Sequence, residues 1–319
     1  MTTVSITPRL GADIREWKQR RNAIILAHNY ERPEVQDVAD EVGDSLALAR
    51  TAAATDADVI VFCGVHFMAE TAAIVNPTKT VLFPDLNAGC SLADSISADE
   101  LRAWKAQYPG AVVIAYVNTS AEVKAESDYC CTSANAVQVV RSIPADREIL
   151  FLPDLFLGSY VQRVTQRENM HIWMGECHVH AGIAASQVET VLKEHPEAEL
   201  LVHPECGCST SSLYQLADGT LPAERTHVLS TSGMLKCARD STAQEFIVAT
   251  EVGILHQMQR HSPDKRFMAA NREAVCPFMK MITLEKVLDA LQQNRHVVTV
   301  PNAVAKRARV AIDRMIAIG

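Results

Sequence analysis

The sequence predicts an α/β protein made of three pseudo-threefold-related units, each a short parallel sheet covered by helices on both faces. Two observations predict this class. Continuous apolar segments of strand length alternate with segments of helical pattern, which is typical of parallel sheets buried on both sides. Chemically similar landmarks also recur at matching distances in three stretches of the chain, and such internal repetition indicates a pseudo-symmetric fold.

Nine apolar segments are expected to form strands. They are residues 24–28, 59–65, 79–83, 111–117, 148–152, 171–174, 199–203, 226–229 and 245–250. Because these segments are apolar without alternation, we expect three-layer α/β/α domains and not open antiparallel sheets. The expected domains are residues 1–104, 105–190 and 191–319, the last including two C-terminal helices, with the active site at their junction.

Helical patterns lie between the expected strands. Three of them open on a serine, at Asp44-Ser45, Thr132-Ser133 and Thr231-Ser232. Two more follow residue 276: one is capped by Thr283, and the other covers residues 303–318, each with apolar residues on one face.

The repeat begins at the polar residue that ends the first strand of each unit. A serine follows it after 17 residues in the first two units and after 29 in the third, which is the same spacing with a twelve-residue insertion. A cysteine follows each serine after a further 45, 44 and 44 residues. The landmarks are His28, Ser45 and Cys90, then Tyr116, Ser133 and Cys177, then His203, Ser232 and Cys276. Three coincident landmarks per unit indicate a shared centre, although α/β chains repeat strand–helix units in any case.

Composition excludes several functional classes. The 319 residues are 48% hydrophobic and 21% charged, which suits a large core and not a disordered chain. Thirty Lys and Arg against 38 Asp and Glu give a net charge of −8, so we expect no nucleic-acid partner. Residues 1–22 lack the apolar centre of a signal peptide, and the apolar runs are far shorter than the ~18 residues of a membrane span. We therefore expect a cytoplasmic protein without a membrane partner.

The nine cysteines of this chain are expected to be mostly reduced thiols. Three thiolates at the repeated positions would hold a tetrahedral zinc ion or a 4Fe–4S cluster, and either leaves one coordination position open for a Lewis acid. Cys63 and Cys237 are interpreted as structural or surface residues. The close pairs Cys130-Cys131 and Cys206-Gly207-Cys208 lack C-x-x-C spacing, and the role of the second pair is left open.

Ligands of open α/β sheets bind at the carboxyl ends of the strands. His28, Tyr30, Tyr116, Asn118, His203 and Glu205 stand at such ends. The three serines lie at expected helix starts, where free N–H groups favour an anion. Each serine alone is most simply an N-cap, but three around one centre would form a cradle for phosphate or carboxylate. His180 is interpreted as a metal ligand or, by preference, as a residue that points into the substrate space.

Eight segments of the chain resemble those of the quinolinate synthase family, over about residues 24–291. They are AHNY at 27–30, VLFPD at 81–85 with Gly89-Cys90, AYVNTS at 115–120, TSANA at 132–136, VHPEC at 202–206, STSGM at 230–234, TEVGILH at 250–256 and MKMI at 279–282.

The resemblance implies one 4Fe–4S cluster at the junction of three α/β domains. Its three cysteine ligands would be Cys90, Cys177 and Cys276, with one open iron. It further implies the condensation of iminoaspartate with dihydroxyacetone phosphate to quinolinate, phosphate and water, on the de novo route to NAD. The aspartate oxidase that supplies iminoaspartate is a candidate partner.

The resemblance also assigns roles to the residues at the strand ends. Tyr30, Tyr116, His203 and Glu205 would line the pocket, with Glu205 as the general base and with Tyr30 and His28 assisting proton transfer. The substrate-binding residues would be Ser45, Asn118, Ser133, Ser232 and His180.

One departure from the family and two alternative functions matter. Some members carry C-x-x-C-x-x-C around the third ligand, in which two cysteines are proposed to form a redox-sensitive pair. Here Cys276 is followed by Pro277 and no nearby cysteine, so we expect this pair to be absent.

The alternatives are an iron–sulfur hydro-lyase of a small hydroxy acid and a non-catalytic protein with zinc on three cysteines. The condensation assay separates the first, and the visible spectrum separates the second because zinc–thiolate sites are colourless.

Overall fold

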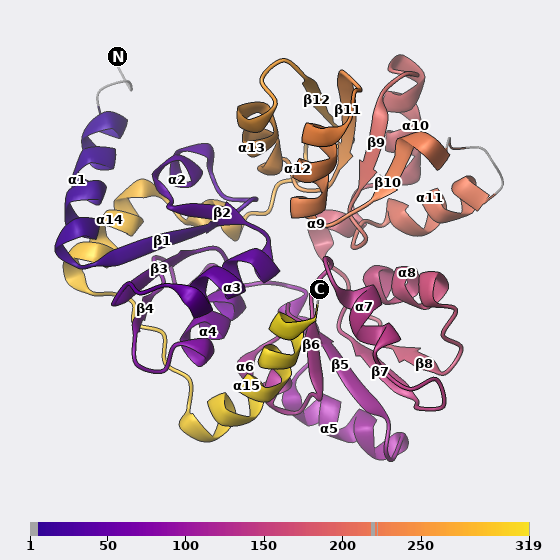
Figure 1. Ribbon diagram of the computed structural model, residues 1–319, viewed down its shortest axis with the longest axis horizontal. Coiled ribbons are helices and arrows are strands. Elements are labelled where there is room, and N and C mark those ends of the chain that lie inside the picture. Colours follow the sequence, from indigo (N-terminus) through magenta and orange to yellow (C-terminus); the bar gives the residue numbers. More distant parts are fainter. Residues whose placement is uncertain (1–5, 218–220, 222, 319) are drawn as a thin grey trace.

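The computed structural model of the chain describes residues 6–217, 221 and 223–318. It contains three four-stranded sheets in which every strand pair is parallel. Each sheet has the same order, with the second strand of the unit at one edge, then the first, the third and the fourth. This confirms the expected α/β class, and Figure 1 shows the three sheets arranged around a common centre.

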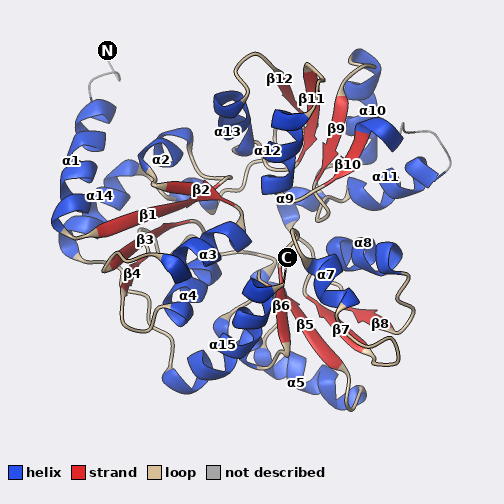
Figure 2. Ribbon diagram, viewed as in Figure 1, coloured by secondary structure: helices blue, strands red, loops and turns tan. Residues whose placement is uncertain are grey.

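The first sheet is built from the N-terminal part of the chain. Its strands are β1 (Ala23–His28), β2 (Glu41–Gly43), β3 (Val59–Cys63) and β4 (Thr80–Leu82). Its helices are α1 (Ile6–Arg20), α2 (Pro33–Val38), α3 (Ser45–Ala54) and α4 (His66–Val75). Every residue of β3 is buried, as expected for a central strand that has helices on both faces (Figure 2).

The second sheet repeats this plan. Its strands are β5 (Val112–Tyr116), β6 (Tyr129–Cys131), β7 (Ile149–Leu152) and β8 (Met170–Ile172). The helical segments are η1 (Ala93–Ser95), α5 (Ala98–Gln107), α6 (Ala121–Ala125), α7 (Ala136–Arg141) and α8 (Leu155–Thr165).

The third sheet consists of β9 (Glu199–Val202), β10 (Thr226–Val228), β11 (Glu245–Ala249) and β12 (Arg266–Ala269). Its helical segments are α9 (His178–Ala181), α10 (Ala185–Glu194), α11 (Cys208–Ala217), η2 (Ala223–Arg225), α12 (Thr231–Asp240), α13 (Ile254–His261) and η3 (Met279–Met281). The inserted residues of this unit fall in α11 and the segment after it, and residues 218–220 and 222 lie outside the described part of the chain.

All nine expected strands are confirmed, and three further strands are present that the sequence pattern missed. The missed strands are β2, β6 and β12, and each lies at the edge of its sheet. They are three or four residues long, with sequences EVG, YCC and RFMA. Each of these segments has at most one β-branched residue, so it gives little strand signal in the sequence.

The two expected C-terminal helices are confirmed as α14 (Leu284–Gln293) and α15 (Asn302–Ala317). They do not extend the third unit. α14 packs against α1, and α15 packs against α6 and β6 (Figure 1). The end of the chain therefore returns to the first and second units, while the domain boundaries near residues 104 and 190 stay a prediction.

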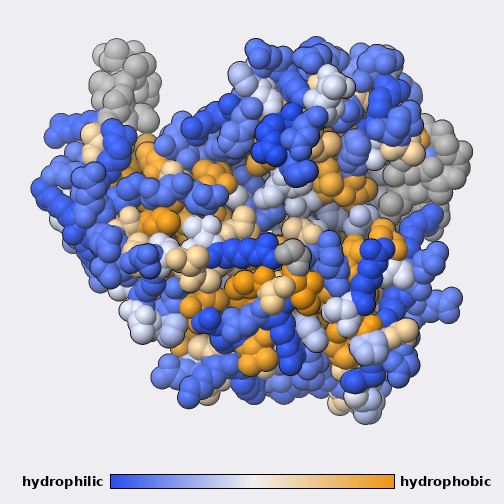
Figure 3. Space-filling view, viewed as in Figure 1, coloured by the Kyte–Doolittle hydropathy of each residue, from blue (hydrophilic) through white to orange (hydrophobic). Residues whose placement is uncertain are grey.

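The main hydrophobic core includes residues of all three sheets, among them Val61, Ile114 and Val248. In Figure 3 polar residues dominate the outer parts of the visible face, while apolar residues gather toward the middle, where the units meet. Among the described helices none is long and apolar enough to cross a lipid bilayer. The shared core holds the sheets in fixed relative positions, which a site between them requires.

Asn135 attaches the end of α15 to the second unit. Its side chain is fully buried, and its Nδ2 donates hydrogen bonds to the carbonyl oxygens of Met315 (3.0 Å) and Ile318 (2.7 Å). Its Oδ1 accepts a hydrogen bond from the backbone N–H of Thr132 at 2.8 Å. One amide therefore satisfies backbone groups at a helix end and in a turn of the second unit.

The substitution Asn135→Ala is expected to lower the free energy of unfolding by about 2–4 kcal/mol, because buried backbone groups lose their partners. Asn169→Ala is the matched control. The Asn169 side chain donates to the carbonyl oxygens of Ala145 and Arg147 at exposed positions, so water replaces its bonds at a cost of about 1 kcal/mol or less. Denaturant unfolding followed by circular dichroism measures both values, and equal losses would contradict the assigned role.

Candidate active site and cysteine centre

A pocket lies at the junction of the three units. It is lined by all of the residues that the sequence proposed for the site except Ser232. His28 is the last residue of β1, Tyr116 is the last residue of β5, and His203 directly follows β9. The carboxyl ends of the three sheets therefore supply one side chain each to the same space, as parallel sheets are expected to do.

The three repeated cysteines lie in turns of the same backbone geometry. The carbonyl group of each accepts a hydrogen bond from the backbone N–H four residues later, from Asp94 to Cys90 (3.1 Å), Ala181 to Cys177 (2.8 Å) and Lys280 to Cys276 (3.2 Å). The backbone N–H groups of the second and third residues after each cysteine lower the pKa of its thiol; these residues are Leu92 and Ala93, Val179 and His180, and Phe278 and Met279. Each cysteine thus begins one helical turn whose free N–H groups point at its sulfur.

The three thiols are half-buried and lie close enough to influence one another. Burial raises the pKa of Cys90, and the neighbouring Cys177 and Cys276 raise it further. Burial, followed by the effect of Cys177, raises the pKa of Cys276 to about 11, although its backbone N–H groups act in the opposite direction. Three thiolates in this space therefore require a positive partner, and a bound metal group provides it.

The three cysteine sulfurs, taken together, fit an iron–sulfur cluster better than a single ion. In the described part of the chain, the ligand atoms of Cys177, His180 and Glu205 all lie within 4.8 Å of one another and could hold one ion, whereas the three cysteine sulfurs do not form such a group. Ligand atoms around one zinc ion lie about 3.4–3.8 Å apart. Sulfur atoms that are spread more widely, each in its own N–H-rich turn, suit a larger metal group.

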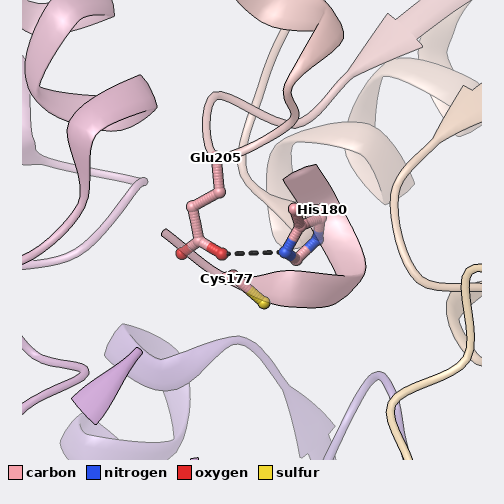
Figure 4. Close-up of side chains that lie close together, drawn as sticks. All are labelled: Cys177, His180 and Glu205. Atoms are coloured by element: carbon pink, nitrogen blue, oxygen red, sulfur yellow. Dashed lines mark ion pairs between the residues drawn. The ribbon is translucent and has the colours of Figure 1, made fainter. Parts of the chain in front are cut away.

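Glu205 stands at the centre of the acid–base residues. The phenol of Tyr116 donates a hydrogen bond to its Oε1, and Nδ1 of His180 lies 3.0 Å from its Oε2 without hydrogen-bond alignment. Figure 4 shows the side chains of Glu205 and His180 pointing toward one another, with Cys177 at the start of the short helix that carries His180. The imidazole rings of His180 and His203 are stacked at 5.0 Å.

Tyr30 is joined to this group through a threonine. Its phenol oxygen lies 2.5 Å from Oγ1 of Thr250 and 3.4 Å from Nε2 of His180. Thr250 also contacts Nε2 of His180 at 2.9 Å. Because a hydroxyl group both donates and accepts, this chain of contacts links a phenol from the first unit to an imidazole beside Cys177.

Burial sets the ionisation of these groups. It lowers the pKa of His28 to about 4 and that of His180 to about 3, and it lowers the pKa of His203 well below its usual value. Burial raises the pKa of Glu205 to about 8, and burial together with the Glu205 charge raises the pKa of Tyr30. Neutral imidazoles therefore surround a carboxyl group that exchanges its proton near neutral pH, a pattern typical of catalytic sites.

The serine positions differ in part from the prediction. Asp44, and not Ser45, is the N-cap of α3, with its Oδ1 accepting from the N–H of Ala47 at 2.9 Å. Ser45 is therefore the first helical residue, and it lines the pocket. Ser133 also lines the pocket but does not start a helix, because α7 begins at Ala136 and Ser133 lies in the turn before it.

In the third unit the pocket is lined by Thr231 and not by Ser232. Ser230 is the N-cap of α12, since its Oγ accepts from the N–H of Gly233 at 3.3 Å. It also donates to Oδ2 of Asp44 at 3.2 Å. The caps of α3 and α12 are thus joined across the pocket, a contact that the spacing of the serines did not indicate.

Sequence reasoning missed Thr250, Glu251 and Lys280 as residues of the site. Glu251 is fully buried; it accepts from the backbone N–H of Cys276 at 3.0 Å and lies 3.0 Å from Nζ of Lys280. Lys280 also donates to the carbonyl oxygen of Tyr30. Glu251 and Lys280 lie in the TEVGILH and MKMI segments, which the sequence analysis had already singled out. Only the fold brings these two segments together.

Cys206 and Cys208 are bonded to each other as a disulfide at the start of α11. The sequence left their role open and expected mostly reduced thiols, so this pairing is a difference from the expectation. The other seven cysteines are free.

A pocket with three equivalent cysteine turns, neutral imidazoles and a titrating carboxyl group defines an enzyme site that is able to hold a metal group. The family model described as quinolinate synthetase A protein matches residues 12–317. The chain belongs to this family. The membership confirms the family and the enzyme class that the sequence indicated, a condensing enzyme of NAD biosynthesis.

Curated relatives named quinolinate synthase match nearly the whole chain. The protein of Mycobacterium sp. (strain KMS) is 58% identical over 316 residues, covering 99% of this chain and 94% of the relative. That of Mycobacterium tuberculosis (strain ATCC 25618 / H37Rv) is 57% identical over 311 residues, covering 98% and 89%. That of Mycolicibacterium paratuberculosis is 56% identical over 309 residues, covering 97% and 88%.

The substitution Thr250→Val is expected to lower turnover about 10- to 100-fold, because the phenol of Tyr30 and the imidazole of His180 lose a shared hydrogen-bond partner worth about 1–3 kcal/mol. Thr226→Val serves as the control, since the hydroxyl group of Thr226 is buried without a hydrogen-bond partner. Steady-state kinetics with iron content measured in parallel tests both variants. A Thr250 variant with wild-type turnover would remove this residue from the site.

Proposed function

We propose that this chain condenses iminoaspartate with dihydroxyacetone phosphate to form quinolinate, phosphate and water, using one 4Fe–4S cluster held by Cys90, Cys177 and Cys276. Support for the reaction comes from relatives named quinolinate synthase at 56–58% identity. The observation that carries the proposal is the set of three equivalent cysteine turns around one pocket that also holds Glu205 and Tyr30.

Three cysteine ligands leave one iron of such a cluster without a thiolate. When bound, the cluster supplies a Lewis acid at that iron, which polarises oxygen groups of the substrate and helps water to leave. The overall reaction needs no net oxidation or reduction. Each of the three units, with proposed boundaries near residues 104 and 190 and with α14 and α15 packed on the first two units, would contribute one ligand.

Glu205 is the proposed general base. Carbon–carbon bond formation requires removal of a proton from a carbon atom, and a group that titrates near the working pH does this most effectively. With a pKa of about 8, Glu205 both takes up and returns protons at neutral pH. Tyr116 and His180 contact its two oxygens and fix the direction of the carboxyl group.

Tyr30 is the proposed proton donor, assisted by His28. Its raised pKa keeps the phenol protonated, and Thr250 and His180 orient the hydroxyl group. The backbone N–H of Tyr30 donates to Nδ1 of His28 at 3.2 Å. This hydrogen bond fixes the orientation of the His28 imidazole at the end of β1.

The anionic groups of the substrates are proposed to bind beside Ser45, Asn118 and Ser133. Ser45 lies in the first turn of α3, where free backbone N–H groups and the helix dipole favour an anion. Oδ1 of Asn118 is buried without a partner, so a ligand N–H or O–H would complete its hydrogen bonding. We further propose a cytoplasmic location and the aspartate oxidase as the supplier of iminoaspartate.

The substitution Cys177→Ala is expected to abolish both the cluster and the activity. Anaerobically purified enzyme should contain about four irons and four sulfides per chain and absorb broadly near 400 nm, and the variant should lose both signals. Cys131→Ala is the control, because Cys131 is buried in β6 and does not itself line the pocket. A Cys177 variant that kept the full cluster, or an intact wild-type cluster without condensation of the two substrates, would contradict the proposal.

The substitution Tyr30→Phe separates proton transfer from cluster binding. We expect iron and sulfide contents to stay at the wild-type level while turnover falls by about 10²–10⁴, the usual contribution of a proton-transfer group. Tyr108→Phe is the matched control, since Tyr108 packs on Trp104 outside the pocket. Normal turnover of the Tyr30 variant would show that the phenol takes no part in catalysis.

A further inference from the structure

We propose that the third unit carries a second metal site, separate from the cysteine pocket, in which Glu199, His227 and Cys237 bind one zinc ion. Glu199 begins β9, His227 lies in β10, and Cys237 lies near the end of α12. None of the three lines the pocket. The sequence pattern suggested only a structural or surface role for Cys237, because its partners are distant in the chain.

The spacing of the ligand atoms matches a tetrahedral zinc ion. Nε2 of His227 lies 3.4 Å from Oε2 of Glu199, and Sγ of Cys237 lies 3.8 Å from the same oxygen. All three ligand atoms are within 4.8 Å of one another. Zinc bond lengths of about 2.1 Å to nitrogen and oxygen and about 2.3 Å to sulfur give tetrahedral separations of about 3.4 Å for N···O and about 3.6 Å for S···O.

Among the three ligand atoms, Sγ of Cys237 donates to Oε2 of Glu199, so a metal ion would replace the proton of this thiol. Nε2 of His227 is buried and has no hydrogen-bond partner, so a cation would satisfy an atom that is otherwise unpaired. Oε1 of Glu199 accepts a hydrogen bond from Oγ of Ser241 at 2.6 Å. This second contact holds the carboxylate with its other oxygen toward His227 and Cys237, as supporting residues do around metal ligands.

Charges of both signs lie near the three ligands. His227 is the single partner of Glu199 among the ion pairs of the described residues. The ammonium group of Lys265 donates to the carbonyl oxygens of Ala238 (2.6 Å) and Ser241 (2.5 Å), and its positive charge also acts on the thiol of Cys237. The side chains of Glu199 and His227 keep 14% and 31% of their exposure, so an ion and one water ligand can reach the site from solvent.

The chemical class of the ion follows from the donors. A thiolate, an imidazole and a carboxylate together suit zinc better than magnesium or calcium, which prefer oxygen ligands alone. Bound there, zinc would join the last turn of α12 to β9 and β10. The first residue of the same helix, Thr231, lines the cysteine pocket, so the site would stabilise the helix that carries this part of the pocket wall.

Zinc binding tests the proposal on the cluster-containing enzyme. Anaerobically purified protein is treated with EDTA, supplied with zinc chloride and desalted, and its zinc and iron are measured by mass spectrometry. We expect about one zinc per chain with unchanged iron, and at least tenfold weaker zinc binding in Cys237→Ala and in His227→Gln. His195→Gln is the matched control, because His195 faces Glu245 at 3.1 Å with no cysteine in the group, and it should bind zinc normally.

A second measurement follows stability. Zinc is expected to raise the thermal unfolding midpoint of the wild type and of His195→Gln, because a ligand that binds the folded state stabilises it. It should leave the midpoints of Cys237→Ala and His227→Gln unchanged, with their iron contents at the wild-type level as evidence of correct folding. The proposal is overturned if the wild type retains no zinc, if both variants bind zinc as tightly as the wild type, or if zinc enters only as iron is lost, which would place it at Cys90, Cys177 and Cys276.

Discussion

Three half-buried thiols face one pocket, and their mutual repulsion as thiolates is the constraint on which the site depends. The backbone N–H groups of the turn that follows each cysteine lower the pKa of its thiol, yet removal from water still holds that pKa high. Backbone dipoles therefore reduce the cost of three negative charges without removing it. A cationic metal group such as the proposed cluster would offset the remaining cost, and its binding would be coupled to ionisation of the three thiols.

The surroundings of the cysteines are fixed by contacts between units. Glu251 binds the backbone of Cys276 and pairs with Lys280, and Lys280 also binds the carbonyl group of Tyr30. Cys276, the proposed third ligand, and Tyr30, the proposed proton donor, are thereby held by the same ion pair. Because both charges are largely removed from water, loss of either one would leave the other uncompensated, which is more costly than the pair itself is stabilising.

Burial also determines the ionisation state of the other groups in the pocket. Imidazoles stay neutral, the phenol of Tyr30 stays protonated, and Glu205 titrates near neutral pH. A low-dielectric space thus provides hydrogen-bond donors and one exchangeable proton from ordinary side chains. The position of each group comes from a strand end, which explains why a repeated α/β unit is an effective frame for such a site.

The sequence by itself determined the α/β class, nine of the twelve described strands and the three repeated cysteines, because apolar periodicity and repeat spacing are local properties of the chain. All but one of the site residues that it proposed line the pocket. Only the tertiary structure decided the edge strands β2, β6 and β12, the return of α14 and α15 to the first two units, and the choice of Thr231 over Ser232. The Glu251–Lys280 pair and the group of Glu199, His227 and Cys237 are likewise tertiary. Their partners are far apart in sequence, and a contact between distant residues exists only after the sheets have packed.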